Sequence, residues 1–165
     1  MNTPLNAQLI QCPGGAHRNF VLGGRYAKPG QRLRRVLLAE GTRLAKFTDA
    51  NLFHGGRVSP WWVFDRRVSG LDAGLDSVLQ LARASGRPLT DCIRDMYAVM
   101  FEWNSLALLN TPFLRIQRIK LTCDAYAFHG PAAPVDGNRP PLASASSVPR
   151  PFSGGALQLY IPNLT

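Results

Sequence analysis

The sequence is poor in acidic residues. It has 10 aspartates and glutamates against 19 lysines and arginines, so its formal net charge is +9. Only two of the acids are glutamates, Glu40 and Glu102. The chain is therefore badly supplied for the paired-carboxylate chemistry of glycosidases. A positive field of this size attracts phosphates, nucleic acid or acidic proteins, and it says nothing about the fold.

Cysteine is also scarce, with Cys12, Cys92 and Cys123 far apart in the chain. There is no Cys-x-x-Cys pair, and no histidine stands at ligand spacing from any of the three cysteines. This pattern argues against a disulfide framework or a zinc site, and we expect no metal. We expect buried or partly buried thiols in a reducing compartment.

Long hydrophobic runs are missing. No apolar stretch approaches the roughly 18–20 residues that span a bilayer, and the first five residues do not begin a secretory signal. We therefore expect no membrane association. The expected location is cytoplasmic, or a target cell that receives the protein as an effector by a route that reads no such signal.

The common catalytic motifs are lacking as well. There is no phosphate-binding loop, no dinucleotide-binding glycine pattern, no nucleophile elbow and no zinc-protease helix. The histidines His17, His54 and His129 are scattered beside glycines and small residues. They are predicted to be ordinary loop histidines.

The patterns that are present predict a single α+β domain over residues 1–165, with a compact split antiparallel β-sheet core. Apolar periodicity predicts two amphipathic helices in the middle of the chain, over 71–84 and from an N-cap at Thr90 to Pro112. Gly86 is expected to end the first helix. A Pro/Ala/Ser-rich mobile loop is expected over 131–151. Strands are expected over 34–39, 44–48, 61–65, 113–123, 124–129 and 156–161.

Two of the predicted strands have further features. The piece over 44–48 is predicted either to stand alone or to continue the strand over 34–39 after a bend. The apolar alternation slips between Ile116 and Ile119, which predicts a bulge there.

The basic residues are concentrated near the start of the chain. Eight of them precede Thr48, together with a single acid, Glu40. Aromatic residues stand among them, so the segment offers both cations and stacking surfaces for a nucleic-acid-binding module. Two alternatives are a non-enzymatic interaction or adaptor protein with an acidic partner, and a merely solvated basic face. The phosphate-binding candidates are Arg25, Arg32, Arg34 and Arg35.

Three further segments carry a family likeness. They are Gly-Thr-Arg-Leu-Ala-Lys-Phe-Thr-Asp (41–49), Val-Ser-Pro-Trp-Trp (58–62), and His-Gly-Pro-Ala-Ala-Pro (129–134) with the strand that follows Gly154-Gly155. Together they resemble bacterial toxin domains with an ADP-ribosyltransferase-like fold, most closely the tuberculosis necrotizing toxin type, which hydrolyses NAD. The likeness covers roughly 34–64 and 113–162.

The resemblance implies roles for particular residues. Gln158 matches the late catalytic position, Lys46 the basic residue of the first strand, and Ser59, Trp61 and Trp62 the nicotinamide side. Lys46 and Gln158 would then meet across one cleft. NAD is the implied substrate, and an immunity or adaptor protein is an implied partner.

Two departures from the family pattern limit the activity expected. Lys46 stands where the family usually has arginine, and lysine cannot make the forked contact that arginine makes with phosphate. The last strand offers no glutamate, so an NAD glycohydrolase is expected over an ADP-ribosyltransferase that modifies proteins. The blander interpretations make Trp61 and Trp62 core or rim aromatics, and Gln158 the solvent-facing member of an alternating strand.

Overall fold

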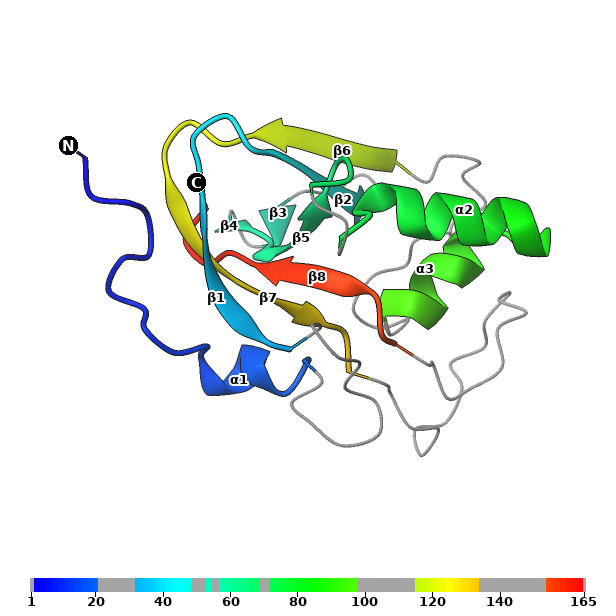
Figure 1. Ribbon diagram of the computed structural model, residues 1–165, viewed down its shortest axis with the longest axis horizontal. Helices are drawn as coiled ribbons and strands as arrows, with labels where there is room; N and C mark the ends of the chain where they lie inside the picture. The colour runs from blue at the N-terminus through cyan, green and yellow to red at the C-terminus, as the bar shows by residue number, and fades with distance from the viewer. Residues whose placement is uncertain are drawn as a thin grey trace.

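The computed structural model describes residues 2–20, 32–48, 53–54, 57–68, 72–97, 115–133 and 154–164. Within them lies one six-stranded antiparallel sheet in the order β1-β7-β8-β5-β2-β6 (Figure 1). The predicted α+β arrangement, with two longer helices in mid-chain, is confirmed. The helices are α1 (Gly14–His17), α2 (Leu75–Ser85) and α3 (Leu89–Tyr97). The strands of the sheet are β1 (Arg34–Leu38), β2 (Arg43–Thr48), β5 (Trp61–Phe64), β6 (Arg115–Lys120), β7 (Ala125–Pro131) and β8 (Leu157–Tyr160).

A small separate hairpin lies between β2 and β5. It consists of β3 (Phe53–His54) and β4 (Arg57–Val58). β2 does not continue β1, because β1 pairs with β7 and β2 lies between β5 and β6. The two ends of the sheet order, β1 and β6, are therefore far apart within the sheet.

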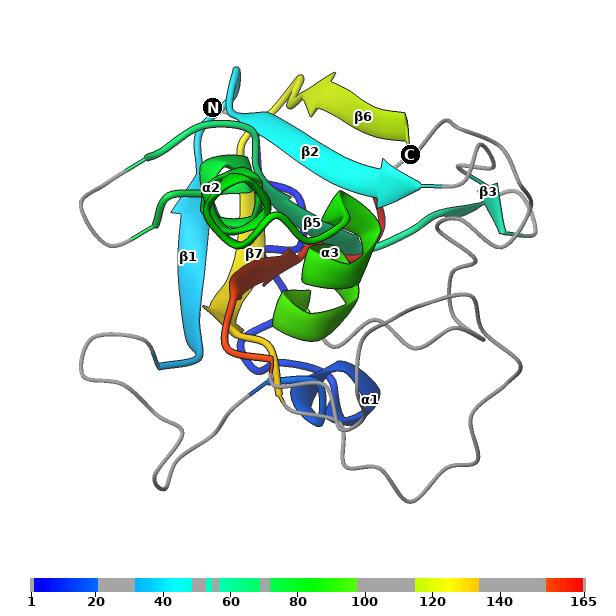
Figure 2. The ribbon, with the colours of Figure 1, turned by 90° about the vertical axis from the view of Figure 1, so that its right-hand side faces the viewer.

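Strand β5 changes its pairing partner along its length. Its first half pairs with β8, where Trp62 is opposite Leu159, and its second half pairs with β2, where Val63 is opposite Ala45. The sheet bends around this strand. Figure 2 shows β1 and β7 running upright while β2 and β6 cross above them, with α2 and α3 in front.

The two faces of the bent sheet bury two separate cores. Leu44 and Ala45 are adjacent in β2 and fully buried, and each belongs to a different core because successive strand residues point to opposite faces. The helix core lies under α2 and α3 and contains Ala45, Val63, Leu75, Val78, Cys92, Ile93, Tyr97 and Ala156. The sheet core on the other face contains Leu38, Leu44, Trp62, Phe64, Leu121, Ala125, Ala127, Leu159 and Ile161.

Helix α2 begins later than its periodicity predicts. Gly74 precedes it with a φ of 56°, and a Cβ there would lie 2.4 Å from the carbonyl oxygen of Phe64. Only glycine fits this close approach, so the chain turns at 74 before the helix can start. The predicted C-terminal glycine is confirmed, since Gly86 is left-handed with a φ of 66°.

Helix α3 begins one residue before the predicted cap. Thr90 is its second residue and so does not cap it. The helix is described to Tyr97, and the rest of the predicted helix towards Pro112 lies outside the described residues. Its buried stripe includes Cys92 and Ile93, which pack in the helix core.

The predicted bulge in β6 is wrong. Six consecutive residues of β6 pair with six of β2 without interruption. Ile116 is opposite Phe47, which packs against the helix core, and Ile119 is opposite Leu44 in the sheet core. The alternation slips because both faces of β6 pack against a core.

The predicted loop over 131–151 does not start at its first residue. Pro131 is the last residue of β7, and Ala132 forms an antiparallel bridge with Phe20. Residues 134–151 lie outside the described ones.

Candidate functional site

The three segments that carry the family likeness become neighbours in the sheet. They supply β2, β5 and the pair β7 and β8, which stand together in the order β7-β8-β5-β2. They are far apart in sequence, yet backbone hydrogen bonds join each strand to the next. The arrangement brings the candidate residues onto one sheet, and the direction of each side chain then decides which of them share a site.

Gln158 lies in the middle of β8 and is buried, with 9% of its surface exposed. Its Nε2 donates to the main-chain oxygen of Asn19 at 2.9 Å. The same oxygen accepts the amide hydrogen of Ala133, also at 2.9 Å. Gln158 is therefore not a solvent-facing strand residue. It belongs to a tight junction between the N-terminal segment, β7 and β8.

The residues before β8 are also held in place, by contacts with α3 and with the end of β7. Gly154 and Gly155 have positive φ angles of 66° and 90°. The amide of Gly154 donates to Asp95 of α3 at 2.8 Å, and that of Gly155 donates to Ala132 at 2.8 Å. Because Gly154 approaches the backbone of residues 132–133 so closely, a Cβ there would collide with it. The Gly-Gly pair thus holds the strand that carries Gln158 between α3 and β7.

Trp61 lies on the same face as Gln158. It pairs with Tyr160. Gln158 and Tyr160 are two residues apart in β8, so their side chains point to the same face. Its ring is packed between Phe20, at 5.5 Å between centroids, and Tyr160, at 4.9 Å. Ser59 supports it, since the Ser59 hydroxyl oxygen accepts the Trp61 amide at 3.4 Å. Trp61 is thus part of an aromatic row that the N-terminal segment covers.

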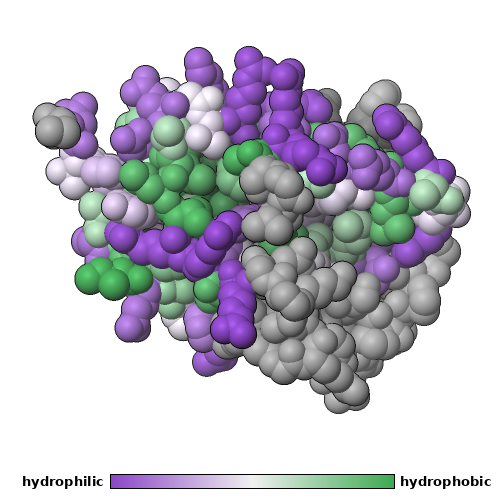
Figure 3. Space-filling view, in the orientation of Figure 1, coloured by the Kyte–Doolittle hydropathy of each residue, from purple (hydrophilic) through white to green (hydrophobic). Residues whose placement is uncertain are grey.

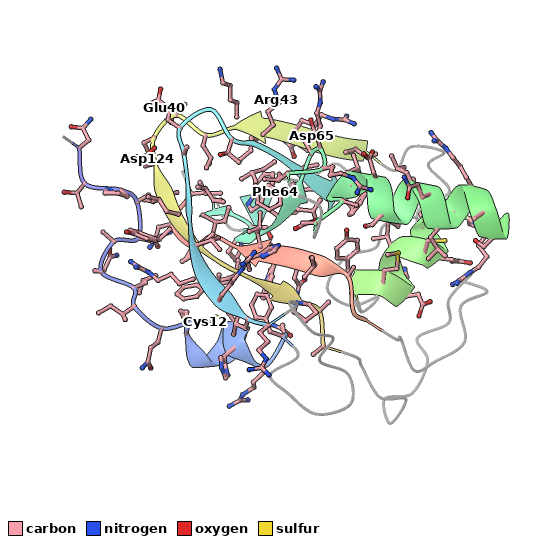
Figure 4. The ribbon with its side chains drawn as sticks, in the orientation of Figure 1. Cys12, Glu40, Arg43, Phe64, Asp65 and Asp124 are labelled. Carbon is pink, nitrogen blue, oxygen red and sulfur yellow. The ribbon has the colours of Figure 1, made fainter. Side chains whose placement is uncertain are left out.

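Cys12 lies in the N-terminal segment just before α1 (Figure 4), near Tyr160 of this row. Burial raises the pKa of its thiol to about 11. Burial also raises the pKa of Tyr160, and the nearby Cys12 thiol adds to that shift. Of the other two cysteines, Cys92 is buried as expected, but Cys123 is exposed, contrary to the prediction of buried thiols.

Lys46 and Trp62 lie on the opposite face. Trp62 is 2% exposed in the sheet core, and its indole nitrogen has no hydrogen-bond partner among the described residues. Lys46 follows Leu44 by two residues, so it shares the sheet-core face, where it stands opposite Gln117 of β6. The structure does not bring Lys46 to Gln158. The predicted site residues form two groups, one on each face.

A buried polar pair that the sequence did not reveal lies on the face opposite Gln158. His129 Nε2 is 2.5 Å from Asp72 Oδ2, and both residues are 5% exposed. The other carboxylate oxygen of Asp72 accepts the amide of Gly74 at 2.7 Å. The His129 ring also packs 5.8 Å from that of Phe64. The prediction of a loop histidine is wrong for His129, which belongs to β7.

The prediction of a loop position is wrong for the other two histidines as well. His17 is the last residue of α1, and His54 is in β3. The sequence signal for the buried pair is the Asp72-Ala73-Gly74 step ahead of α2, in which an aspartate bonds the backbone amide two residues later. That signal marks a turn and does not name a histidine partner.

Tyr97 at the end of α3 adds a buried hydroxyl to the same region. The hydroxyl has no hydrogen-bond partner in bonding geometry among the described residues. The nearby Ser77 hydroxyl donates to the carbonyl of Gly74 at 2.8 Å. Burial raises the pKa of Tyr97 to about 12. The Asp72 carboxylate adds to the rise and Ser77 opposes it.

Basic residues lie at both edges of the sheet. On β1, Arg34 is exposed, whereas Arg35 is held inward, with its guanidinium 3.4 Å above the Tyr126 ring and its Nη2 donating to the Ala7 carbonyl. Arg32 is exposed just before β1, and Arg25 lies outside the described residues. The four residues suggested for phosphate binding are therefore not equivalent, because Arg35 is committed to internal contacts.

The opposite edge of the sheet is also basic. Arg43 and Lys120 are exposed and directly opposite each other on β2 and β6, and Arg118 pairs with Asp65 at 2.8 Å. Figure 3 shows hydrophilic side chains gathered over these strands, and Figure 4 places Arg43 and Asp65 there. Glu40 and Asp124 lie beside this edge, where the Asp124 carboxylate accepts the Glu40 amide at 2.7 Å. Two groups of basic residues therefore lie at opposite ends of the sheet, one on β1 and one on β2 and β6.

No family model matches the sequence, and neither a curated protein nor a solved structure matches it. In the part of the chain that the structure describes, no helix is long and apolar enough to cross a membrane. Over the same residues, no group of three or more His, Cys, Asp or Glu side chains could hold a metal ion.

Proposed function

We propose that the chain is an NAD-cleaving domain that hydrolyses the bond between nicotinamide and ribose. The observation that supports this most is the adjacency of β7, β8, β5 and β2. The segments that resemble the NAD-hydrolysing toxins are spread over residues 41–162, and they become neighbouring strands of one sheet. If the short motifs resembled the toxins only by chance, there would be no reason for their strands to be neighbours in the sheet.

The proposed reaction breaks the C–N bond between ribose and nicotinamide and forms a C–O bond to water. Nicotinamide leaves with the bonding electron pair, and the water gives up a proton, so the products are ADP-ribose, nicotinamide and H⁺. Positive charge grows on the ribose as the C–N bond weakens. A group that fixes the ribose hydroxyls, and thereby orients the reacting carbon, lowers this barrier. Gln158 is the residue proposed for that role.

The side-chain directions refine the proposed site. It is centred on the face of β8 that carries Gln158, beside Trp61 and the N-terminal segment. Lys46 belongs to the other face, so another cation is needed for the pyrophosphate. Among the described residues, Arg18 is the best candidate for this cation. It is exposed and directly precedes Asn19, whose carbonyl oxygen accepts a hydrogen bond from Gln158. Trp61 contributes only the part of its ring that Phe20 and Tyr160 leave uncovered.

The test is nicotinamide release from NAD by the purified chain. We expect wild-type protein to release nicotinamide, and Gln158→Ala to lose about 100-fold or more of that rate, as when a transition-state hydrogen bond is removed. Gln80→Ala is a matched control, since Gln80 is exposed on α2. Circular dichroism would check that both variants are folded. Folded wild-type protein that releases no nicotinamide at millimolar NAD would exclude the proposal.

A further inference from the structure

We propose that the outer edge of β6 takes up one more β-strand, supplied by an acidic protein partner. The partner is defined by its chemistry, as an extended segment in which acidic side chains alternate with uncharged ones. This assignment follows from the backbone and the charges of β2 and β6, so it does not depend on the proposed NAD chemistry.

Strand β6 is the last strand in the order of the sheet. Within the described residues, no strand pairs with its outer side, and its six residues pair only with β2. Figures 1 and 2 show β6 along the outside of the molecule, with no labelled helix or strand beyond it. An edge of this kind presents main-chain N–H and C=O groups to a strand from another chain.

Two hydrogen bonds show which way the main chain of β6 faces. Leu121 directly follows β6, and its amide donates to the Thr42 carbonyl at 2.9 Å, so the main chain of Leu121 faces β2. The Arg43 carbonyl accepts the Asp65 amide at 3.2 Å, so it faces β5. Arg43 and Lys120 are directly opposite each other, and they therefore form a pair without mutual hydrogen bonds. The main-chain groups of Lys120 point away from β2, towards the free edge.

The same direction recurs at every second residue of β6. Because main-chain groups alternate in direction along a strand, those of Arg118 and Ile116 point outward together with those of Lys120. Each of these three residues offers one N–H donor and one C=O acceptor. In an antiparallel ladder, each of them can exchange two hydrogen bonds with the residue opposite. The edge is therefore complementary to an added strand.

The side chains of the outward-facing residues make this edge basic. Arg118 and Lys120 are exposed on β6, and Arg43 is exposed opposite Lys120. Arg118 pairs with Asp65 at 2.8 Å, yet its side chain remains 54% exposed. The edge thus has cations left over for acidic side chains that lie opposite Arg118 and Lys120.

Charges beyond the paired residues support this placement. Arg66 and Arg67 are exposed and directly follow Asp65 at the end of β5. Glu40 and Asp124 lie in the turns before β2 and after β6, where the Asp124 carboxylate accepts the Glu40 amide at 2.7 Å. Acids therefore stand at one end of the edge, and its centre carries cations.

The other face of β6 calls for uncharged side chains. Gln117 and Ile119 point to the sheet-core face, and Ile119 packs partly buried against that core. The Gln117 Oε1 is buried and has no hydrogen-bond partner among the described residues. A partner strand would extend the sheet core with an apolar side chain opposite Ile119. A hydroxyl opposite Gln117 would supply a donor to its Oε1.

Charge distinguishes this partner from a second copy of the chain. Pairing of β6 with β6 would bring Arg118 and Lys120 of two copies together, and like charges opposite each other destabilise a sheet. The other end of the sheet is no better, since β1 carries the exposed Arg34. Cations on an edge strand oppose pairing between copies, and the same cations attract an acidic strand. Nucleic acid would also match the charge, but it cannot pair with the alternating donors and acceptors.

The test uses the full chain and a synthetic peptide, Glu-Val-Glu-Thr-Val, extended by neutral polar residues at both ends. In antiparallel pairing its two glutamates are opposite Lys120 and Arg118, and its threonine is opposite Gln117. We expect a Kd of roughly 10–100 µM at low salt, measured by fluorescence anisotropy, that weakens as salt rises. In NMR hydrogen exchange, the peptide should slow the amides of Ile116, Arg118 and Lys120.

Matched controls exist on both sides of the contact. N-methylation of the two glutamate amides removes their bonds to Lys120 and Arg118, so binding should fall about tenfold or more. N-methylation of the first valine and the threonine, whose amides point away from β6, should change it little. Lys120→Glu should also weaken binding about tenfold or more, because it places like charges opposite each other. Arg83→Glu reverses an exposed charge on α2 and should bind as the wild type does.

Three results would overturn the proposal. The first is no binding at about 1 mM peptide, and the second is an equal loss of binding from the two N-methylated peptides. The third is duplex DNA that displaces the peptide and leaves the edge amides unprotected, which would assign the basic edge to nucleic acid. Nicotinamide release does not enter any of these measurements, so the proposed function and this contact fail or stand separately.

Discussion

The two buried polar centres beside β7 and β8 are held in different ways. On one face, His129 is held by the side chain of Asp72, and the contact ties β7 to the turn before α2. On the other face, Gln158 is held by the main-chain carbonyl of Asn19, which has a second donor in Ala133. In the first centre, the Asp72 carboxylate makes both hydrogen bonds, one with His129 and one with the Gly74 amide. In the second centre, the acceptor is a backbone carbonyl, and both of its donors, the Gln158 side chain and the Ala133 amide, are uncharged.

This difference suggests separate roles for the two faces. A buried carboxylate that satisfies two donors is expensive to lose and contributes mainly to folding. A neutral amide in a backbone cradle is cheaper to replace and keeps a fixed orientation, which suits a group that contacts a ligand. Three substitutions can break or sharpen this comparison.

The largest effect on stability is expected for Asp72→Ala. It leaves His129 Nε2 and the Gly74 amide without their buried acceptor, at a cost of about 3–5 kcal/mol. Urea unfolding at pH 7 measures this cost. The control is Asp76→Ala, an exposed acid in the first turn of α2, with an expected cost of at most about 1 kcal/mol. If the two variants lost equal free energy of unfolding, the buried pair would contribute no more to stability than an exposed acid does.

An intermediate effect, confined to alkaline pH, is expected for Tyr97→Phe. The pKa of Tyr97 is raised from 10.0 to about 12 by burial, with a smaller contribution from Asp72. The unfolded state therefore ionises first, and the wild type loses stability as pH rises from 10 towards 12. The loss amounts to about 2–3 kcal/mol over that window.

The measurement for Tyr97 is urea unfolding of both proteins at pH 8 and pH 11. At pH 8 the variant should lie within about 1 kcal/mol of the wild type, because the hydroxyl lacks a partner among the described residues. The variant should then lose less stability than the wild type between the two pH values. Parallel losses would contradict the raised pKa.

The smallest effect on stability is expected for Gln158→Leu. The substitution removes one hydrogen bond, while the Asn19 oxygen keeps the Ala133 donor, so the cost should be about 1–2 kcal/mol. Urea unfolding beside Asp72→Ala gives the comparison directly. If Gln158→Leu cost more than Asp72→Ala, the distinction between a structural face and a ligand face would fail.

Much of the fold could be predicted because its signals are local. The strand β8 follows from its apolar alternation, and β5 follows from its aromatic and β-branched residues. The end of α2 follows from Gly86 and Pro88, which act on their own turn. The start of α2 could not be predicted, since the packing of Gly74 on Phe64 decides it. The slip at Ile116 and Ile119 misled because a strand with two packed faces has no polar side to alternate with.

The candidate site was less predictable, for a related reason. Gln158 was singled out by its motif, yet its partner Asn19 is 139 residues away. The contact between His129 and Asp72 spans 57 residues. Strand pairing brings such groups together, and the spacing of residues along the sequence does not predict which strands pair. The direction of Lys46 could have been inferred from its distance to Leu44, but only once β2 and β5 were known to separate two cores.

The divided pairing of β5 has a consequence for how the protein unfolds. Its first half holds β8 and its second half holds β2, so a break in this one strand uncouples both cores at once. The sheet core and the helix core should then melt as one cooperative unit instead of two. In hydrogen exchange, the backbone amides of β5 should be among the slowest in the molecule, and those of β1 and β6 at the two ends of the sheet should exchange first.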